Sequence, residues 1–171
     1  RYQQKIDSGK AGVLPIQTCC INFGNEINYL EVLRASACYG SETVHLIGNY
    51  MGTGQSARAI SGTTNRIIET ICHKTPNDFI WYCRDNEIKI LALELPEDKG
   101  IQVTEIYDYH FDFDNGQKTV IVGGNETTGV PLEILKAAEV IFIPMPGSGY
   151  CLNVSQAINV ALYEASRQYA K

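Results

Sequence analysis

The chain has 171 residues, of which 44% are hydrophobic and 19% are charged, and its formal net charge is −5. This length fits one domain that buries a core without disulfides or metals, and the composition excludes intrinsic disorder. No apolar run approaches the roughly 20 residues that cross a bilayer, and the polar residues 1–10 lack a secretory signal pattern. We therefore expect no membrane partner. The acidic balance argues against nonspecific nucleic-acid binding, although clustered basic residues can still contact phosphate.

Apolar strand patterns alternate with helical patterns along the whole chain. Strands are expected at 16–23, 43–47, 68–73, 88–95, 119–122 and 140–143. Helices are expected at 27–39 (ended by Gly40), 56–60, 77–86, 131–138 and 153–169. A glycine-rich loop follows at 48–54, and residues 103–113, heavy in Tyr and Asp, are expected at the surface. In the last helix, Ile158, Ala161, Leu162 and Ala165 recur at helical spacing and predict one packed face.

This alternation predicts an α/β fold with a mainly parallel sheet flanked by helices. We expect a single domain over residues 15–171, preceded by an N-terminal tail or extension at 1–14. The six cysteines are Cys19, Cys20, Cys38, Cys72, Cys83 and Cys151. Their spacing matches neither a disulfide framework nor a zinc site, so we expect free thiols in a reducing cytoplasm and no bound metal.

Common nucleotide and hydrolase motifs are absent from the expected positions. The turn after the first strand has one glycine, Gly24, where a dinucleotide fold needs GxGxxG. The loop at 48–54 is followed by Gln55 and Ser56, without the lysine that a phosphate-binding loop requires. The histidines lie outside the glycine-flanked turns of a catalytic triad.

Two glycine-bearing segments, 122–131 and 143–155, each join a strand to a helix. Both follow the carboxyl end of a predicted parallel strand, where open α/β sheets bind ligands. Glycines there let backbone N–H and C=O groups approach a ligand closely. Taken singly, each segment is better explained as an ordinary turn that needs glycine for its geometry.

Together with an upstream segment, these residues resemble the SpoU/TrmH family of RNA 2′-O-ribose methyltransferases, part of the SPOUT superfamily. The first family motif is an Asn followed six residues later by an Arg, here Asn28 and Arg34. The second is a strand followed by Gly-x-Glu-x-x-Gly, here 124–129. The third is Ile-Pro-Met and then Leu-Asn-Val-Ser, here 143–145 and 152–155. A Ser-Gly pair of the family is matched at 61–62, and the resemblance covers residues 15 to 170.

The resemblance implies a C-terminal trefoil knot that forms a pocket for S-adenosyl-L-methionine. It implies methylation of a ribose 2′-hydroxyl in RNA, with tRNA favoured over rRNA because no RNA-binding domain is appended. It also implies a cytoplasmic homodimer in which the partner subunit completes each site. The implied cofactor-binding residues are Gly124, Gly129, Ile143, Met145 and Leu152, and the implied catalytic residues are Arg34, Asn28, Glu126, Asn153 and Cys151.

Arg34 has two possible roles under this resemblance. The family uses this arginine to deprotonate the hydroxyl, but a guanidinium is effectively always protonated. We favour a bidentate grip on the target phosphate that orients the hydroxyl for in-line attack. For Asn28 a helix N-cap is the structural alternative, and for Glu126 and Asn153 a turn-stabilising role is equally consistent with the pattern.

The chain departs from the family pattern in three places. Cys151 stands where the family prefers Ser, and Leu30 and Glu31 stand where it prefers small residues. Glu31 would pair with Arg34 at i, i+3 or repel RNA phosphate. These departures keep open a catalytically impaired cofactor- or RNA-binding module, and beyond it a nucleotide-binding protein without RNA. Arg58, Arg66 and Lys74 form either a basic patch or a scatter of solvated charges.

Overall fold

The computed structural model describes residues 14–22, 24–41, 43–48, 68–96, 100–113, 116–149 and 151–169. Most of the glycine-rich loop, the expected helix at 56–60 and the Ser-Gly pair at 61–62 lie outside the described residues. The same holds for Arg58 and Arg66 of the possible basic patch, while Lys74 is described and exposed.

In the described part of the chain, seven parallel strands form one sheet in the order β3-β2-β1-β6-β4-β7-β5. The strands are β1 (Ile16–Ile21), β2 (Thr43–Ile47), β3 (Glu69–His73), β4 (Ile88–Leu93), β5 (Val103–Glu105), β6 (Lys118–Gly123) and β7 (Glu139–Phe142). The predicted α/β fold with a parallel sheet is confirmed. Central strands such as β6 are buried along nearly their whole length because helices cover both faces.

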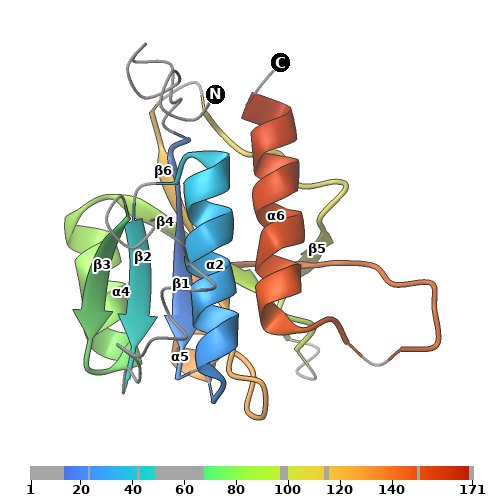
Figure 1. The fold of residues 1–171 in the computed structure, drawn as a ribbon, viewed down its shortest axis with the longest axis horizontal. Coiled ribbons are helices and arrows are strands. Elements are labelled where there is room, and N and C mark those ends of the chain that lie inside the picture. Colours follow the sequence, from blue (N-terminus) through green and yellow to red (C-terminus); the bar gives the residue numbers. More distant parts are fainter. Residues whose placement is uncertain are drawn as a thin grey trace.

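The helices that pack on the sheet in the described residues are α2 (Glu26–Tyr39), α4 (Pro76–Asp85), α5 (Leu132–Ala137) and α6 (Val154–Tyr169). Helices α2 and α6 lie side by side on one face, and α4 and α5 lie on the other (Figure 1). Two hydrophobic cores result, one on each side of the sheet. None of these helices is long and apolar enough to cross a membrane in the part of the chain that the structure describes.

Local signals set the ends of α2. The side chain of Asn25 accepts a hydrogen bond from the backbone N–H of Ile27 at 3.0 Å, so Asn25 is the N-cap. The alternative of Asn28 as the cap is therefore wrong. Gly40 ends the helix, as predicted, with a φ of 84° that favours glycine over residues with a side chain.

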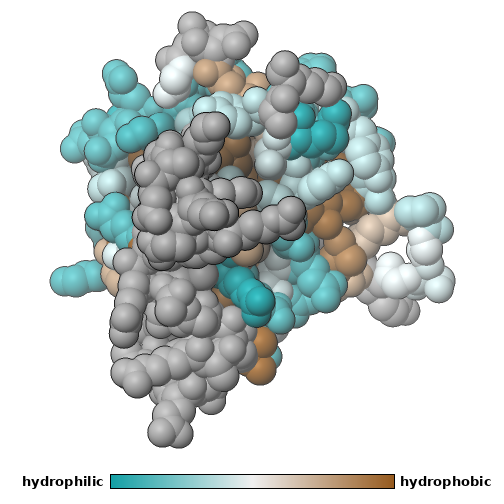
Figure 2. All heavy atoms as spheres, turned by 45° about the horizontal axis from the view of Figure 1, so that its top comes forward, coloured by the Kyte–Doolittle hydropathy of each residue, from teal (hydrophilic) through white to brown (hydrophobic). Residues whose placement is uncertain are grey.

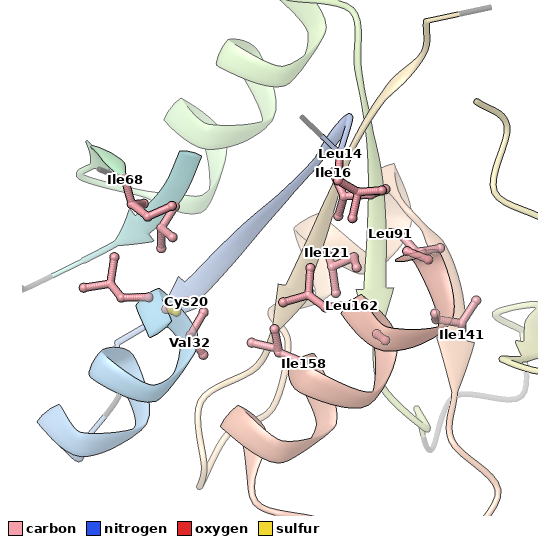
Figure 3. Close-up of a cluster of buried hydrophobic side chains, with 14 of the residues drawn as sticks. Leu14, Ile16, Cys20, Val32, Ile68, Leu91, Ile121, Ile141, Ile158 and Leu162 are labelled. Atoms are coloured by element: carbon pink, nitrogen blue, oxygen red, sulfur yellow. The ribbon is translucent and has the colours of Figure 1, made fainter. Parts of the chain in front are cut away.

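Helix α6 buries the face that its spacing predicted. Ile158, Ala161, Leu162 and Ala165 are all 0% exposed. Figure 3 shows Ile158 and Leu162 directed toward Ile121 of β6 and Leu91 of β4. The helix comes so close to the end of β6 that a Cβ at Gly123 would lie 2.6 Å from Ile158 Cδ1.

The prediction that residues 103–113 lie at the surface is right for five of them, which are exposed (105, 107, 108, 110 and 112), and wrong for three that are buried. β5 extends the sheet by pairing with β7, and Ile106, Tyr109 and Phe111 are buried. The Gln168 side chain of α6 holds this segment, since it accepts from Phe111 N at 3.0 Å and donates to Tyr109 O at 2.9 Å. The aromatic residues alternate with polar residues that stay exposed, and that alternation indicates a half-buried segment better than its Tyr and Asp content.

All six cysteines are free, as predicted. Among the residues that the structure describes, no group of three or more His, Cys, Asp or Glu side chains is arranged to hold a metal ion.

Candidate active site

The motif-bearing loops meet at one edge of the sheet. In the parallel register, Cys20 of β1 and Leu93 of β4 both align with Gly123 of β6, and Leu93 also aligns with Ile141 of β7. These four adjacent strands therefore end at the same edge. The loops that leave them carry the second and third motifs and lead into α2, which carries the first. This is the edge where open α/β sheets bind ligands.

Hydrogen bonds join Asn28 to two motif residues that are 98 and 125 positions away in sequence. Asn28 Nδ2 donates to Glu126 Oε1 at 2.5 Å, and Asn153 Nδ2 donates to Asn28 Oδ1 at 3.0 Å. Glu126 Oε2 accepts from the backbone N–H of Gly24 at 3.0 Å. Asn28 is buried, whereas Glu126 and Asn153 are exposed. One residue from each motif thus meets at one point.

Ser155 and Glu31 extend this network. Asn153 Oδ1 accepts from Ser155 N at 2.9 Å and lies 2.7 Å from Ser155 Oγ. Ser155 Oγ donates to Glu31 Oε2 at 2.5 Å. The sequence predicted that Glu31 either pairs with Arg34 or repels RNA phosphate. In the structure, Glu31 instead forms a hydrogen bond with Ser155, which lies on α6. We call Glu31, Asn28, Glu126, Asn153 and Ser155 the rim network.

The carboxylate of Glu126 is held in its charged form. Burial alone would raise the pKa of Glu126, but hydrogen bonds from backbone N–H groups, first that of Gly24, and from the Asn28 side chain lower it. At neutral pH the carboxylate is therefore a fixed negative charge and a poor proton acceptor. It ties the loop after β6 to the start of α2.

The second motif folds into a tight turn. Asn125 N donates to Gly129 O at 3.0 Å and Gly129 N donates to Asn125 O at 2.9 Å. A Cβ at Gly124 would lie 2.4 Å from the carbonyl carbon of Gly129, so only glycine permits this approach. Gly129 has a φ of 67°. Turn geometry therefore requires both glycines.

Glu94 lies at the same edge of the sheet and was not identified from the sequence. It follows the last residue of β4, and its Oε2 accepts from Val130 N at 2.9 Å while its Oε1 accepts from Leu95 N at 3.0 Å. The predicted strand ran through Leu95 and so placed Glu94 inside it. An acidic residue directly after a buried apolar strand was the available signal.

The third motif begins on a loop that projects from the body of the protein. Figure 1 shows the segment between β7 and α6 reaching outward, and it protrudes on the same side in Figure 2. Ile143 is partly buried against the core, whereas Met145, Cys151 and Leu152 are exposed. A Cβ at Gly147 or Gly149 would meet nothing within 4 Å. The structure thus brings Asn153 to the rim network and leaves Met145 uncovered.

Arg34 lies on the exposed side of α2, six residues after Asn28 and three after Glu31. At 1.5 Å per residue it stands about 9 Å along the helix from Asn28. Asn28, Glu31 and Arg34 are spaced by three, so Glu31 is a surface neighbour of each of the other two. This row winds around the helix from buried Asn28 to exposed Arg34.

A cavity of about 320 Å³ lies at the other end of the sheet. Its lining includes the first residues of β4 and β7 and the ends of α4 and α5, with Arg84, Lys89 and Lys136 as its basic side chains. Lys89 is paired with Glu139 at 3.1 Å. None of the predicted site residues lines this cavity, so it is separate from the candidate active site.

Comparison with known proteins agrees with this geometry. The model of the SpoU rRNA Methylase family matches residues 16–163. The chain belongs to this family. It is 34% identical over 144 residues to the tRNA (guanosine(18)-2′-O)-methyltransferase of Escherichia coli K12, an alignment that covers 82% of this chain and 58% of the relative. The chain therefore spans less than two thirds of the length of that relative.

Solved structures of the family share the fold. The A. aeolicus TrmH/SpoU tRNA modifying enzyme superposes with a TM-score of 0.79 at 22% identity, covering 98% of this chain and 84% of the other. The SpoU methyltransferase AviRb from Streptomyces viridochromogenes, solved with AdoMet, gives 0.76 at 19% identity, covering 90% and 60%. The threading of a knot by the C-terminal segment stays a prediction.

Proposed function

We propose that this chain transfers the methyl group of S-adenosyl-L-methionine to a ribose 2′-hydroxyl of RNA, with tRNA favoured over rRNA. The observation that carries the proposal is the rim network, in which Asn28, Glu126 and Asn153 join the three family motifs by hydrogen bonds. Membership of the family and the named activity of the E. coli relative support the same reaction.

The residues at the rim fit the cofactor. Gly124 and Gly129 form the tight turn of the second motif at this edge, and Ile143, Met145 and Leu152 would offer apolar contacts for an adenine ring. The cofactor supplies a methyl group on a positively charged sulfur. Two carboxylates, Glu94 and Glu126, lie near this edge and complement a positive charge.

Within this reaction, Arg34 would hold the RNA. Its guanidinium has the planar fork that binds phosphate bidentately, and its exposed place on α2 suits contact with a polymer. Asn28 and Asn153 would fix the loop between β7 and α6 relative to α2. Cys151 is exposed and lies two residues before Asn153 in the sequence. We propose for it a contact at the edge of the substrate site.

We further propose a homodimer and a cytoplasmic location. Val160 and Tyr163 on α6 and Ile27 on α2 are 38%, 58% and 46% exposed, which gives the α2–α6 face apolar area for a second copy. The six free thiols suit a reducing compartment. Light scattering behind size exclusion should give twice the chain mass, and an active monomer at micromolar concentration would contradict the dimer.

The decisive experiment is a methyl-transfer assay with labelled S-adenosyl-L-methionine and unmodified tRNA or rRNA transcripts, followed by nucleoside analysis. A 2′-O-methylated nucleoside in tRNA is the expected product. Arg34→Lys should lose about 100-fold in turnover because an ammonium cannot form the fork, while Arg84→Lys on α4 serves as the matched control. Cofactor binding without any methyl transfer would instead indicate the impaired binding module.

A further inference from the structure

Glu94 connects the loops that carry the second and third motifs. In the sheet, β4 lies between β6 and β7, so its carboxyl end stands between the two loops. Glu94 follows the last residue of β4, and its backbone N–H donates to Ile141 O on β7 at 3.0 Å. Its side chain reaches the loop after β6, where Oε2 accepts from Val130 N at 2.9 Å. A residue outside the three motifs therefore joins both loops.

The carboxylate of Glu94 is held by backbone donors at both oxygens. Val130 is only 5% exposed, so its N–H needs an acceptor within the protein, and Glu94 Oε2 provides it. The other oxygen, Oε1, accepts from Leu95 N at 3.0 Å. With both oxygens engaged, the carboxylate cannot turn without losing a bond. It thereby fixes the position of Val130 relative to β4.

Glu94 also packs against the turn of the second motif. A Cβ at Gly129 would lie 2.5 Å from Glu94 Oε2, and Gly129 has a φ of 67°. A Cβ at Gly124 would lie 2.4 Å from the carbonyl carbon of Gly129. The turn is therefore closed on itself and seated on the end of β4, with no room for a side chain at either glycine.

We propose that Glu94 is a positioning residue for the cofactor, an inference that rests on the proposed function. Its backbone and side chain set the spacing between the turn at 124–129 and the loop that begins at Ile143, the two segments that would enclose S-adenosyl-L-methionine. Glu94 acts through Val130 and Ile141 and needs no contact with the cofactor. A carboxylate suits this task because it offers two acceptor oxygens to two N–H donors, whereas the side chain of a glutamine offers one.

Two substitutions of Glu94 grade the loss of these bonds. Glu94→Gln keeps one acceptor oxygen, and Glu94→Ala removes both. Glu105→Gln is the matched control, because Glu105 is exposed and ends β5 at the same edge of the sheet. Each variant is measured for hydrogen exchange of the Val130 amide without ligand, and for affinity to S-adenosyl-L-methionine and S-adenosyl-L-homocysteine by calorimetry. Values of kcat and KM are measured with tRNA transcript.

In Glu94→Ala, exchange of the Val130 amide should be at least about 10-fold faster, because the N–H loses its acceptor. Affinity for S-adenosyl-L-methionine should fall at least about 10-fold in Glu94→Ala and by a smaller factor in Glu94→Gln. S-adenosyl-L-homocysteine, which lacks the methyl group and the positive charge, should lose affinity by a similar factor. The KM for the cofactor should rise, while kcat at saturating cofactor and the KM for tRNA stay within about 3-fold of the wild type. General destabilisation would instead lower kcat by reducing the active fraction.

Unchanged cofactor affinity in Glu94→Ala would overturn the inference, and so would an unchanged exchange rate of the Val130 amide. An equal loss of affinity in Glu105→Gln would also overturn it. A loss confined to S-adenosyl-L-methionine would show that Glu94 acts on the sulfur charge directly rather than through the turn, which contradicts the positioning role. A wild-type chain that binds no S-adenosyl-L-methionine would refute the proposed function itself.

Discussion

Replacing Gly124 by alanine should open the turn of the second motif. The added Cβ would lie 2.4 Å from the carbonyl carbon of Gly129 and 2.6 Å from Val130 N. Both are backbone atoms, so the two sides of the turn must separate by about 1 Å to reach ordinary packing distance. That shift would break the paired hydrogen bonds of 3.0 and 2.9 Å between Asn125 and Gly129.

The cost follows from those two bonds. Each of the two hydrogen bonds contributes about 0.5–1.5 kcal/mol, and the bond from Val130 N to Glu94 would be strained as well. Gly124→Ala should therefore lower the free energy of unfolding by roughly 2–3 kcal/mol. In a domain of this size the loss lowers the melting temperature by about 4–12 °C. Urea and thermal unfolding measure this directly, and calorimetry should show cofactor affinity reduced at least about 10-fold, or about 1.4 kcal/mol.

Gly147→Ala is the matched control, because a Cβ there would meet nothing within 4 Å. Its stability should stay within about 0.5 kcal/mol of the wild type. The reasoning fails if Gly124→Ala is equally stable, since the backbone approach would then not depend on glycine.

Three further predictions concern the rest of the fold. Burial, and to a smaller extent the charge of His73, lowers the pKa of His45 to about 3. Because an unfolded histidine has a pKa near 6.5, the free energy of unfolding should fall as the pH drops below 6.5. Urea unfolding should show a loss of about 1–2 kcal/mol between pH 7.5 and pH 5.5, and equal stability at the two pH values would contradict this prediction. Gln168→Ala should cost about 1–3 kcal/mol through its bonds to residues 109 and 111, whereas exposed Gln156→Ala should cost almost nothing. Under native conditions iodoacetamide should label the exposed Cys38, Cys72 and Cys151 and should spare the buried Cys19, Cys20 and Cys83. Burial also raises the pKa of Cys83 to about 12, which keeps its thiol protonated and unreactive. Mass spectrometry measures the labelling, and rapid labelling of all six cysteines would contradict the prediction.

The sequence by itself determined the elements and the family. Apolar strand runs, helical spacing and Gly40 predicted most elements to within two residues of the strands and helices observed, because these signals act through neighbours along the chain. The three motifs identified the family for the same reason, since each is a local pattern with fixed spacing. The three buried residues within 103–113 were misjudged because their burial depends on Gln168 and β7, which are far away in sequence.

Only the tertiary structure decided which of these residues meet. Asn28 lies 98 positions from Glu126 and 125 positions from Asn153, and the parallel register of β1, β6, β4 and β7 brings their segments to one edge. The bond between Ser155 and Glu31 joins α6 to α2, and no pattern within either helix contains it. Hydrogen bonds depend on distances in space, and those distances are set when helices and strands from remote parts of the chain pack together.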